Sequence, residues 1–97
     1  MRQFKSDGRY KYYGLGYHYI VEFRWQHRED RLLFVKLIGQ FKEMYGDHII
    51  EEPNAHGFPI KKFNPDYHYE QSFSAKRRRF YLREESALTL ALLKVGT

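Results

Sequence analysis

The residues of this chain that are best suited to chemistry form a basic run followed by aromatic side chains. Four consecutive cations occupy residues 76–79, and Phe80 and Tyr81 follow directly. Adjacent cations repel one another, so the run needs either solvent or an anionic partner. Successive side chains of a strand point to opposite faces, so burial of Phe80 and Leu82 would leave the alternate residues on the open face. Those alternate residues are Arg77, Arg79 and Tyr81.

An open face of this kind could bind a partner through charge and ring stacking. If Tyr67 and Tyr69 also point outward, tyrosines and arginines would form the type of platform that binds single-stranded nucleic acid. The predicted partner-binding residues are Arg77, Arg79, Tyr81, Tyr67, Tyr69 and Lys76. Their partner would be anionic, either an acidic protein surface or RNA or single-stranded DNA. The alternative is a solvated edge strand whose charges prevent aggregation.

Other residue types that support catalysis or metal binding are not arranged for either role. The five histidines form no HxH, HxxxH or HExxH pair, so a metal site would need convergence of distant segments. The acidic pairs at residues 29–30, 51–52 and 84–85 are adjacent in sequence, and adjacent side chains diverge on strands and helices. There is no cysteine, no GxSxG sequence and no glycine-rich phosphate loop. We therefore expect no enzyme, no cofactor and no metal.

The elements that must position the basic run follow from hydrophobic periodicity. Residues 17–26 alternate between aromatic or aliphatic and polar side chains, which predicts a strand with one buried face. A shorter alternating run at residues 9–13 precedes Gly14-Leu15-Gly16, so the two runs could form a hairpin. Residues 29–45 have a helical period that ends at Gly46. Further strands are predicted at residues 48–52, 58–63, 67–73 and 76–82, and a second helix at residues 84–95.

These elements predict an α+β fold with a single domain over residues 1–97. Within this domain, residues 1–8 are expected to form a flexible N-terminal arm. Both helices should cover one face of an antiparallel sheet, because strands with one polar face need only one cover. The arrangement resembles an incomplete ferredoxin-like, split β-α-β sandwich. It is incomplete because no strand follows the second helix, and the N-terminal hairpin could fill that edge. The expected core consists of Val21, Phe23, Phe34, Leu37, Ile38, Phe41, Ile50 and Leu92.

Composition narrows the class of protein further. The chain has 97 residues, and its 9 Tyr, 8 Phe and 1 Trp supply the large side chains that a small core needs. Charged residues make up 30%, and no apolar stretch approaches the roughly 20 residues of a membrane span. The lack of cysteine and of a visible secretory signal favours the cytoplasm. The net charge of +5 is concentrated in residues 1–25 and 58–97, which favours a polar, anionic partner.

The stretch Arg79–Lys94 is similar to the end of many small uncharacterised proteins of tailed bacteriophages. Those proteins end in an aromatic strand, an acidic helix start and a short alanine- and leucine-containing helix. Residues 19–23, followed by the helix at residues 32–45, also fit their strand–helix start. The resemblance is topological, covers about residues 17–45 and 77–96, and carries over no functional residue. It implies a phage origin and, with it, the host cytoplasm as the location.

Together these observations lead to two expectations about function. The first is a small phage-type binding protein that acts by protein–protein contact, as a host-factor modulator or as an accessory or virion subunit. The alternative is a single-stranded nucleic-acid-binding module that uses the basic, tyrosine-rich sheet face. A homo-oligomer is compatible with both, whereas a membrane location is not expected.

Overall fold

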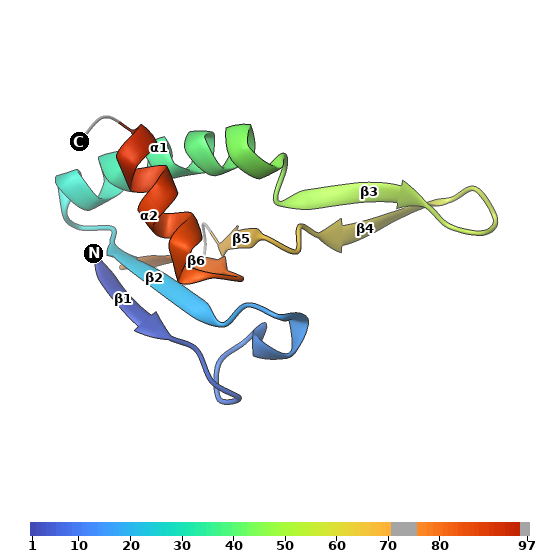
Figure 1. Ribbon diagram of the computed structural model, residues 1–97, viewed down its shortest axis with the longest axis horizontal. Helices are drawn as coiled ribbons and strands as arrows, with labels where there is room; N and C mark the ends of the chain where they lie inside the picture. Colours follow the sequence, from blue (N-terminus) through green and yellow to red (C-terminus); the bar gives the residue numbers. More distant parts are fainter. Residues whose placement is uncertain (71–75, 96–97) are drawn as a thin grey trace.

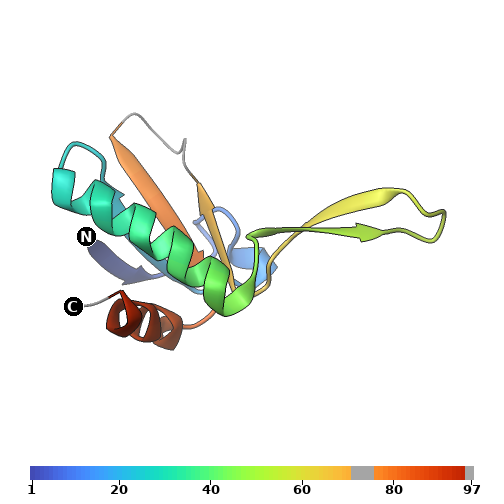
Figure 2. The ribbon, with the colours of Figure 1, turned by 90° about the horizontal axis from the view of Figure 1, so that it is seen from above.

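Two helices lie on one face of a four-stranded antiparallel sheet, and a separate two-stranded hairpin projects from the side of this body (Figures 1 and 2). The structure is a computed structural model and describes residues 1–70 and 76–95. The sheet contains β1 (Arg2–Lys5), β2 (Tyr19–Arg24), β5 (Tyr67–Glu70) and β6 (Arg77–Leu82). The helices are α1 (Arg28–Tyr45) and α2 (Glu85–Lys94), and the projecting hairpin is formed by β3 (Ile49–Pro53) and β4 (Pro59–Phe63). The α+β fold expected from the sequence is confirmed.

The strand order of the sheet is β1-β2-β6-β5, and every neighbouring pair is antiparallel. β6 therefore lies between β2 and β5, which makes β2 and β5 parallel to each other. The outer edge beside β2 is filled by β1, from the N-terminal end of the chain. The interpretation of this arrangement as an incomplete ferredoxin-like sandwich stays a prediction.

The N-terminal segment differs from its prediction. Residues 2–5 form β1 and pair with β2, so the expectation of a flexible arm over residues 1–8 is wrong for these residues. Phe4 anchors the strand, because its ring packs against Tyr10 with centroids 5.3 Å apart. Residues 9–13 form turns and the start of a 3-10 turn (Tyr13–Leu15), not the expected strand. Tyr12 there adopts a left-handed conformation with φ 69°, which breaks the extended backbone that the alternating pattern indicated.

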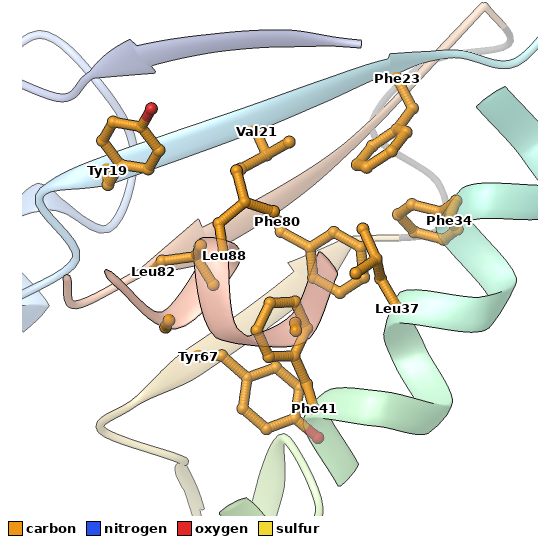
Figure 3. Packing of buried hydrophobic residues seen from close by; sticks show 12 residues of the cluster. Tyr19, Val21, Phe23, Phe34, Leu37, Phe41, Tyr67, Phe80, Leu82 and Leu88 are labelled. Atoms are coloured by element: carbon orange, nitrogen blue, oxygen red, sulfur yellow. The ribbon is translucent and has the colours of Figure 1, made fainter. Parts of the chain in front are cut away.

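The core lies between the sheet and the two helices. Figure 3 shows Phe34, Leu37 and Phe41 of α1 directed toward Phe80 of β6, and all four are fully buried. Leu88 of α2 closes the other side of the same cluster. The apolar residues of α1 recur with the helical period, so they form one continuous stripe that the sheet covers.

The expected core is largely confirmed, with one exception. The residues that are fully buried as expected are Val21, Phe23, Phe34, Leu37 and Phe41. Ile38 and Leu92 are partly buried and pack against this cluster from its margin. Ile50 lies outside the core, because its strand β3 belongs to the projecting hairpin and has no helix to cover it.

The boundaries of α1 follow from local chemistry. Glu29 and Asp30 lie in its first turn, where carboxylates interact favourably with the helix dipole. The helix ends before Gly46, whose φ of 86° is accessible to glycine at little cost. Of the strand predicted over residues 67–73, residues 67–70 form β5 and residues 71–73 lie outside the described residues. Within residues 1–70 and 76–95, neither helix is long and apolar enough to cross a membrane.

Candidate partner-binding surfaces

The sheet face opposite the helices is covered at one end by the loop between β1 and β2. Figure 1 shows this loop below the sheet, on the side away from α1 and α2. Tyr12 of the loop packs edge-on against Tyr81 and His68, with ring centroids 4.9 and 5.2 Å apart. Tyr81 is consequently 1% exposed, and Tyr17 and Ile20 are buried beside it. Tyr81, Tyr17 and Ile20 therefore form a second small core, and the ring of Tyr81 is not accessible for stacking.

The predicted tyrosine–arginine platform is therefore not assembled on the surface. Tyr67 and Tyr69 point to the helix side, because the alternation of β5 places His68 on the opposite face. The ring of Tyr67 stacks on Phe41 at 5.3 Å, and its hydroxyl donates a hydrogen bond to the Gly46 carbonyl at 2.6 Å. The expectation that both tyrosines point outward is wrong. A role in partner binding for the remaining predicted residues stays a prediction.

Next to the buried aromatic residues, a row of alternating charges crosses the four strands. Its members, in strand order, are Arg2, Glu22, Arg79 and Glu70. The guanidinium of Arg79 donates to a carboxylate oxygen of Glu22 at 2.9 Å, and both side chains are largely buried, with exposures of 13% and 6%. Lys11 of the covering loop pairs with Glu70 at 3.2 Å. Arg79 thus stabilises the sheet internally and is not the exposed contact residue that the sequence suggested.

Beyond this row, the same face becomes exposed and strongly basic. Arg24 and Arg77 are directly opposite each other on β2 and β6, and both are exposed. Lys76 is also exposed and precedes β6, with its carbonyl accepting a hydrogen bond from the Trp25 N–H at 2.8 Å. A polar hollow of about 200 Å³ opens here. It is lined by Met1, Arg2, Glu22, Arg24, His27, Asp30 and Arg77. Of the predicted site residues, Arg77 and Lys76 are the ones on an accessible surface.

The β3–β4 hairpin, which we call the arm, is a second candidate surface. Its strands pair only with each other, and nearly all of its residues are exposed. Figure 2 shows the arm extending away from the helices and the sheet. The turn at its tip is ordered by Asn54, whose side-chain oxygen accepts the N–H groups of His56 and Phe58 at 2.8 and 3.0 Å. Phe58 beside this turn is 68% exposed.

The root of the arm is fixed to the body by one buried asparagine. The side-chain amide of Asn64 donates to the carbonyls of Tyr45 and Asp47 at 2.9 and 3.1 Å. Its backbone N–H donates to the His48 carbonyl at 2.8 Å, which closes the hairpin at its base. The hydroxyl of Tyr17 donates to the Asn64 carbonyl, and burial raises the pKa of that hydroxyl to about 12. The arm therefore leaves the body in one defined direction.

Aromatic rings reinforce the root on the open face of the sheet. Phe63, the last residue of β4, stacks on the ring of His68 with centroids 3.9 Å apart and planes 12° apart. Tyr12 packs edge-on against Phe63 at 5.3 Å, and His48 lies 4.0 Å from Tyr69 on the other side. Burial, and then the neighbouring His48, lower the pKa of His68 from 6.5 to about 4. His68 is therefore neutral near pH 7 and serves as a packed ring under the arm.

Within residues 1–70 and 76–95, no group of three or more His, Asp or Glu side chains is placed to hold a metal ion. Comparison with protein-family models, with curated proteins and with solved structures found no match.

Two features of these surfaces were missed by the sequence reasoning. Glu22 lies between apolar residues on the alternating strand, and a buried acid there is a signal that a cation must be paired with it. The arm was predicted as two strands but not as a separate unit. In both of its strands two apolar or proline residues precede two charged ones, so neither strand has a continuous apolar face for the core.

Proposed function

We propose that this chain is a small binding protein that acts by protein–protein contact through the β3–β4 arm. The observation that carries the proposal is an exposed hairpin that contributes no fully buried residue to the core yet is rigidly attached at Asn64. An isolated two-stranded hairpin is marginally stable by itself in water. Its apolar side chains Ile49, Phe58 and Ile60 are all exposed, and exposed aromatic residues are enriched where proteins bind one another.

The charges of the arm favour a protein over a nucleic acid. Glu51 is opposite Lys61, and Lys62 pairs with Glu52 at 2.9 Å, so the acids and cations of the arm balance. Nucleic-acid binding relies on surplus cations that neutralise phosphates. A neutral arm with an aromatic tip lacks that surplus but fits the apolar centre of a protein interface.

A fixed root also lowers the entropy cost of binding. The hydrogen bonds of Asn64 and the stacking of Phe63 on His68 set the direction of the arm before a partner arrives. Pre-organised elements lose less conformational freedom on association, so more of the contact energy appears as affinity. In line with the phage resemblance, we propose a host-factor modulator or an accessory or virion subunit as the form this function takes.

The test compares two equally exposed apolar residues. Phe58 at the arm tip and Leu93 on α2 are both 68% exposed, so Phe58→Ser and Leu93→Ser remove similar exposed apolar surface at different places. The immobilised wild-type chain should retain a discrete protein from a bacterial lysate, and the affinity of the purified pair should then be measured. Phe58→Ser should weaken that affinity by about 30-fold or more, the loss typical of an interface hot spot. Leu93→Ser should leave it unchanged.

The alternative function, binding of single-stranded nucleic acid, is favoured by the accessible arginines at the sheet end. It predicts capture that nuclease treatment abolishes and that falls steeply with salt. In that case both serine variants would bind like the wild type. An equal loss of affinity for the captured protein in the two variants would instead show that the arm has no special role.

A further inference from the structure

We propose that the polar hollow at the arginine end of the sheet binds a phosphate-type oxyanion. The hollow lies where β1, β2 and β6 meet the start of α1, far along the sheet from the covered aromatic residues. This inference goes beyond the proposed function of the arm and does not depend on it.

The first observation is a pair of like charges in direct opposition. The Trp25 N–H donates to the Lys76 carbonyl, which makes residues 25 and 76 a hydrogen-bonded antiparallel pair. The neighbouring pair, Arg24 and Arg77, therefore occupies a non-hydrogen-bonded position, where opposing side chains approach most closely. Like charges in such positions destabilise a sheet. An anion held between the two guanidinium groups would convert this repulsion into attraction.

The second observation is that the nearby carboxylates are already engaged. Glu22 accepts Arg79 at 2.9 Å and lies 3.6 Å from Arg77. Asp30 accepts the Met1 amino group at 3.2 Å and the backbone N–H of Arg24 at 2.8 Å. Among residues 1–70 and 76–95, the guanidinium groups of Arg2 and Arg24 form no ion pair. The hollow therefore keeps an excess of positive charge after its own acids are counted.

The size and the donors of the hollow indicate the class of anion. Three guanidinium groups, from Arg2, Arg24 and Arg77, line it, and each presents a planar fork of N–H donors that matches phosphate oxygens. A phosphate monoester offers near-double negative charge and several acceptor oxygens, whereas a carboxylate offers one charge and two oxygens. A volume of about 200 Å³ suits a single phosphoryl group. Tyr81, the aromatic residue that the sequence predicted for base stacking, is buried and lies outside the lining of the hollow.

The test is a titration of the full chain with sodium phosphate, at ionic strength held constant with sodium chloride. Backbone amide shifts in NMR spectra should report saturable binding centred on residues of the hollow, and the melting temperature should rise with phosphate by mass action. Arg24→Gln and Arg77→Gln should each weaken phosphate binding by about tenfold or more, the loss expected for one charge-assisted contact. Lys36→Gln, which removes an exposed cation of α1 outside the hollow, should bind like the wild type.

A second measurement separates an anion site from general electrostatics. Without phosphate, Arg24→Gln should raise the melting temperature, because it removes the opposed like charges. Addition of phosphate should then raise the melting temperature of the wild type more than that of the variant. A nucleoside 5′-monophosphate should bind about as tightly as phosphate, and the nucleoside alone should not bind. Three results would overturn the proposal. The first is amide shifts that do not saturate with phosphate, and the second is an equal loss of phosphate affinity in Lys36→Gln and the arginine variants. The third is an oligonucleotide without a terminal phosphate that binds more tightly than phosphate.

Discussion

Replacement of Asn64 by alanine should weaken the whole domain, because this residue joins the arm to the end of α1. Asn64 is 2% exposed, and its side chain makes three hydrogen bonds. In two of them the side-chain nitrogen donates to the carbonyls of Tyr45 and Asp47, and in the third the side-chain oxygen accepts the N–H of Asp66. Asn64→Ala leaves these backbone groups without their side-chain partner. A buried polar group that loses its partner carries a desolvation penalty.

The expected magnitude follows from the number of bonds. A neutral hydrogen bond contributes on the order of 1 kcal/mol net, so the loss of three should cost about 3 kcal/mol. A domain of this size has a free energy of unfolding of roughly 5–15 kcal/mol, so the substitution removes a large part of the available stability.

The matched control is the same substitution at the other end of the arm. Asn54 also accepts two backbone N–H groups through its side chain, but it lies in the exposed tip turn. Because the tip can open without disturbing the core, Asn54→Ala should change the global unfolding free energy by less than about 1 kcal/mol. Both variants can be measured by urea unfolding followed by far-UV circular dichroism. Equal costs at the two positions, or a cost below about 1 kcal/mol for Asn64→Ala, would refute the role of Asn64 as the link between arm and body.

Two further predictions concern the open face of the sheet. The pKa of His68 is about 4 in the folded chain and near its ordinary value of 6.5 when unfolded, so the unfolded state takes up the proton first as pH falls. The contribution of His68 to the free energy of unfolding should therefore be constant above about pH 7 and decline by up to roughly 3 kcal/mol between about pH 6.5 and 4. His68→Gln should remove this part of the decline in urea midpoints measured across pH. Arg79→Ala removes the cation at 2.9 Å from the buried Glu22 and should cost about 3 kcal/mol, whereas Arg77→Ala, which removes the cation at 3.6 Å, should stay within about 0.5 kcal/mol. Similar thermal unfolding of the two arginine variants would show that the Arg79–Glu22 pair is not important for the fold.

The parts of the fold that the sequence predicted well are those with a long, regular period. Phe34, Leu37 and Phe41 repeat with the helical period over a long segment, so only one helix face can be apolar. The prediction that Phe80 and Leu82 share the covered face of their strand is confirmed, because the alternate positions at residues 77 and 79 are arginines. In such segments the local pattern and the tertiary packing select the same side chains for burial.

The errors arose where aromatic residues occupy both faces or where partners are distant in sequence. In Tyr67-His68-Tyr69 every side chain is a ring, so alternation alone does not identify the inward face. The alternating run that ends with Tyr12 and Tyr13 looked like a strand, but its rings pack onto residues that follow much later in the chain. The pairing of Arg79 with Glu22 joins β6 to β2, and no local pattern specifies that register.

The position of β6 in the sheet has a consequence for how the chain reaches its native state. The central pair of strands joins Tyr19 to Leu82 and Arg24 to Arg77, so α1, the arm and β5 all lie within the segment that this pairing must close. Closing a long loop costs chain entropy before any contact between its ends compensates for it. The α1 helix and the arm hairpin are local and can form within microseconds, but the sheet that buries α1 depends on a late, non-local encounter. Folding of this small domain should thus be limited by the meeting of β2 with β6, and substitutions that weaken the arm tip should leave the folding rate unchanged.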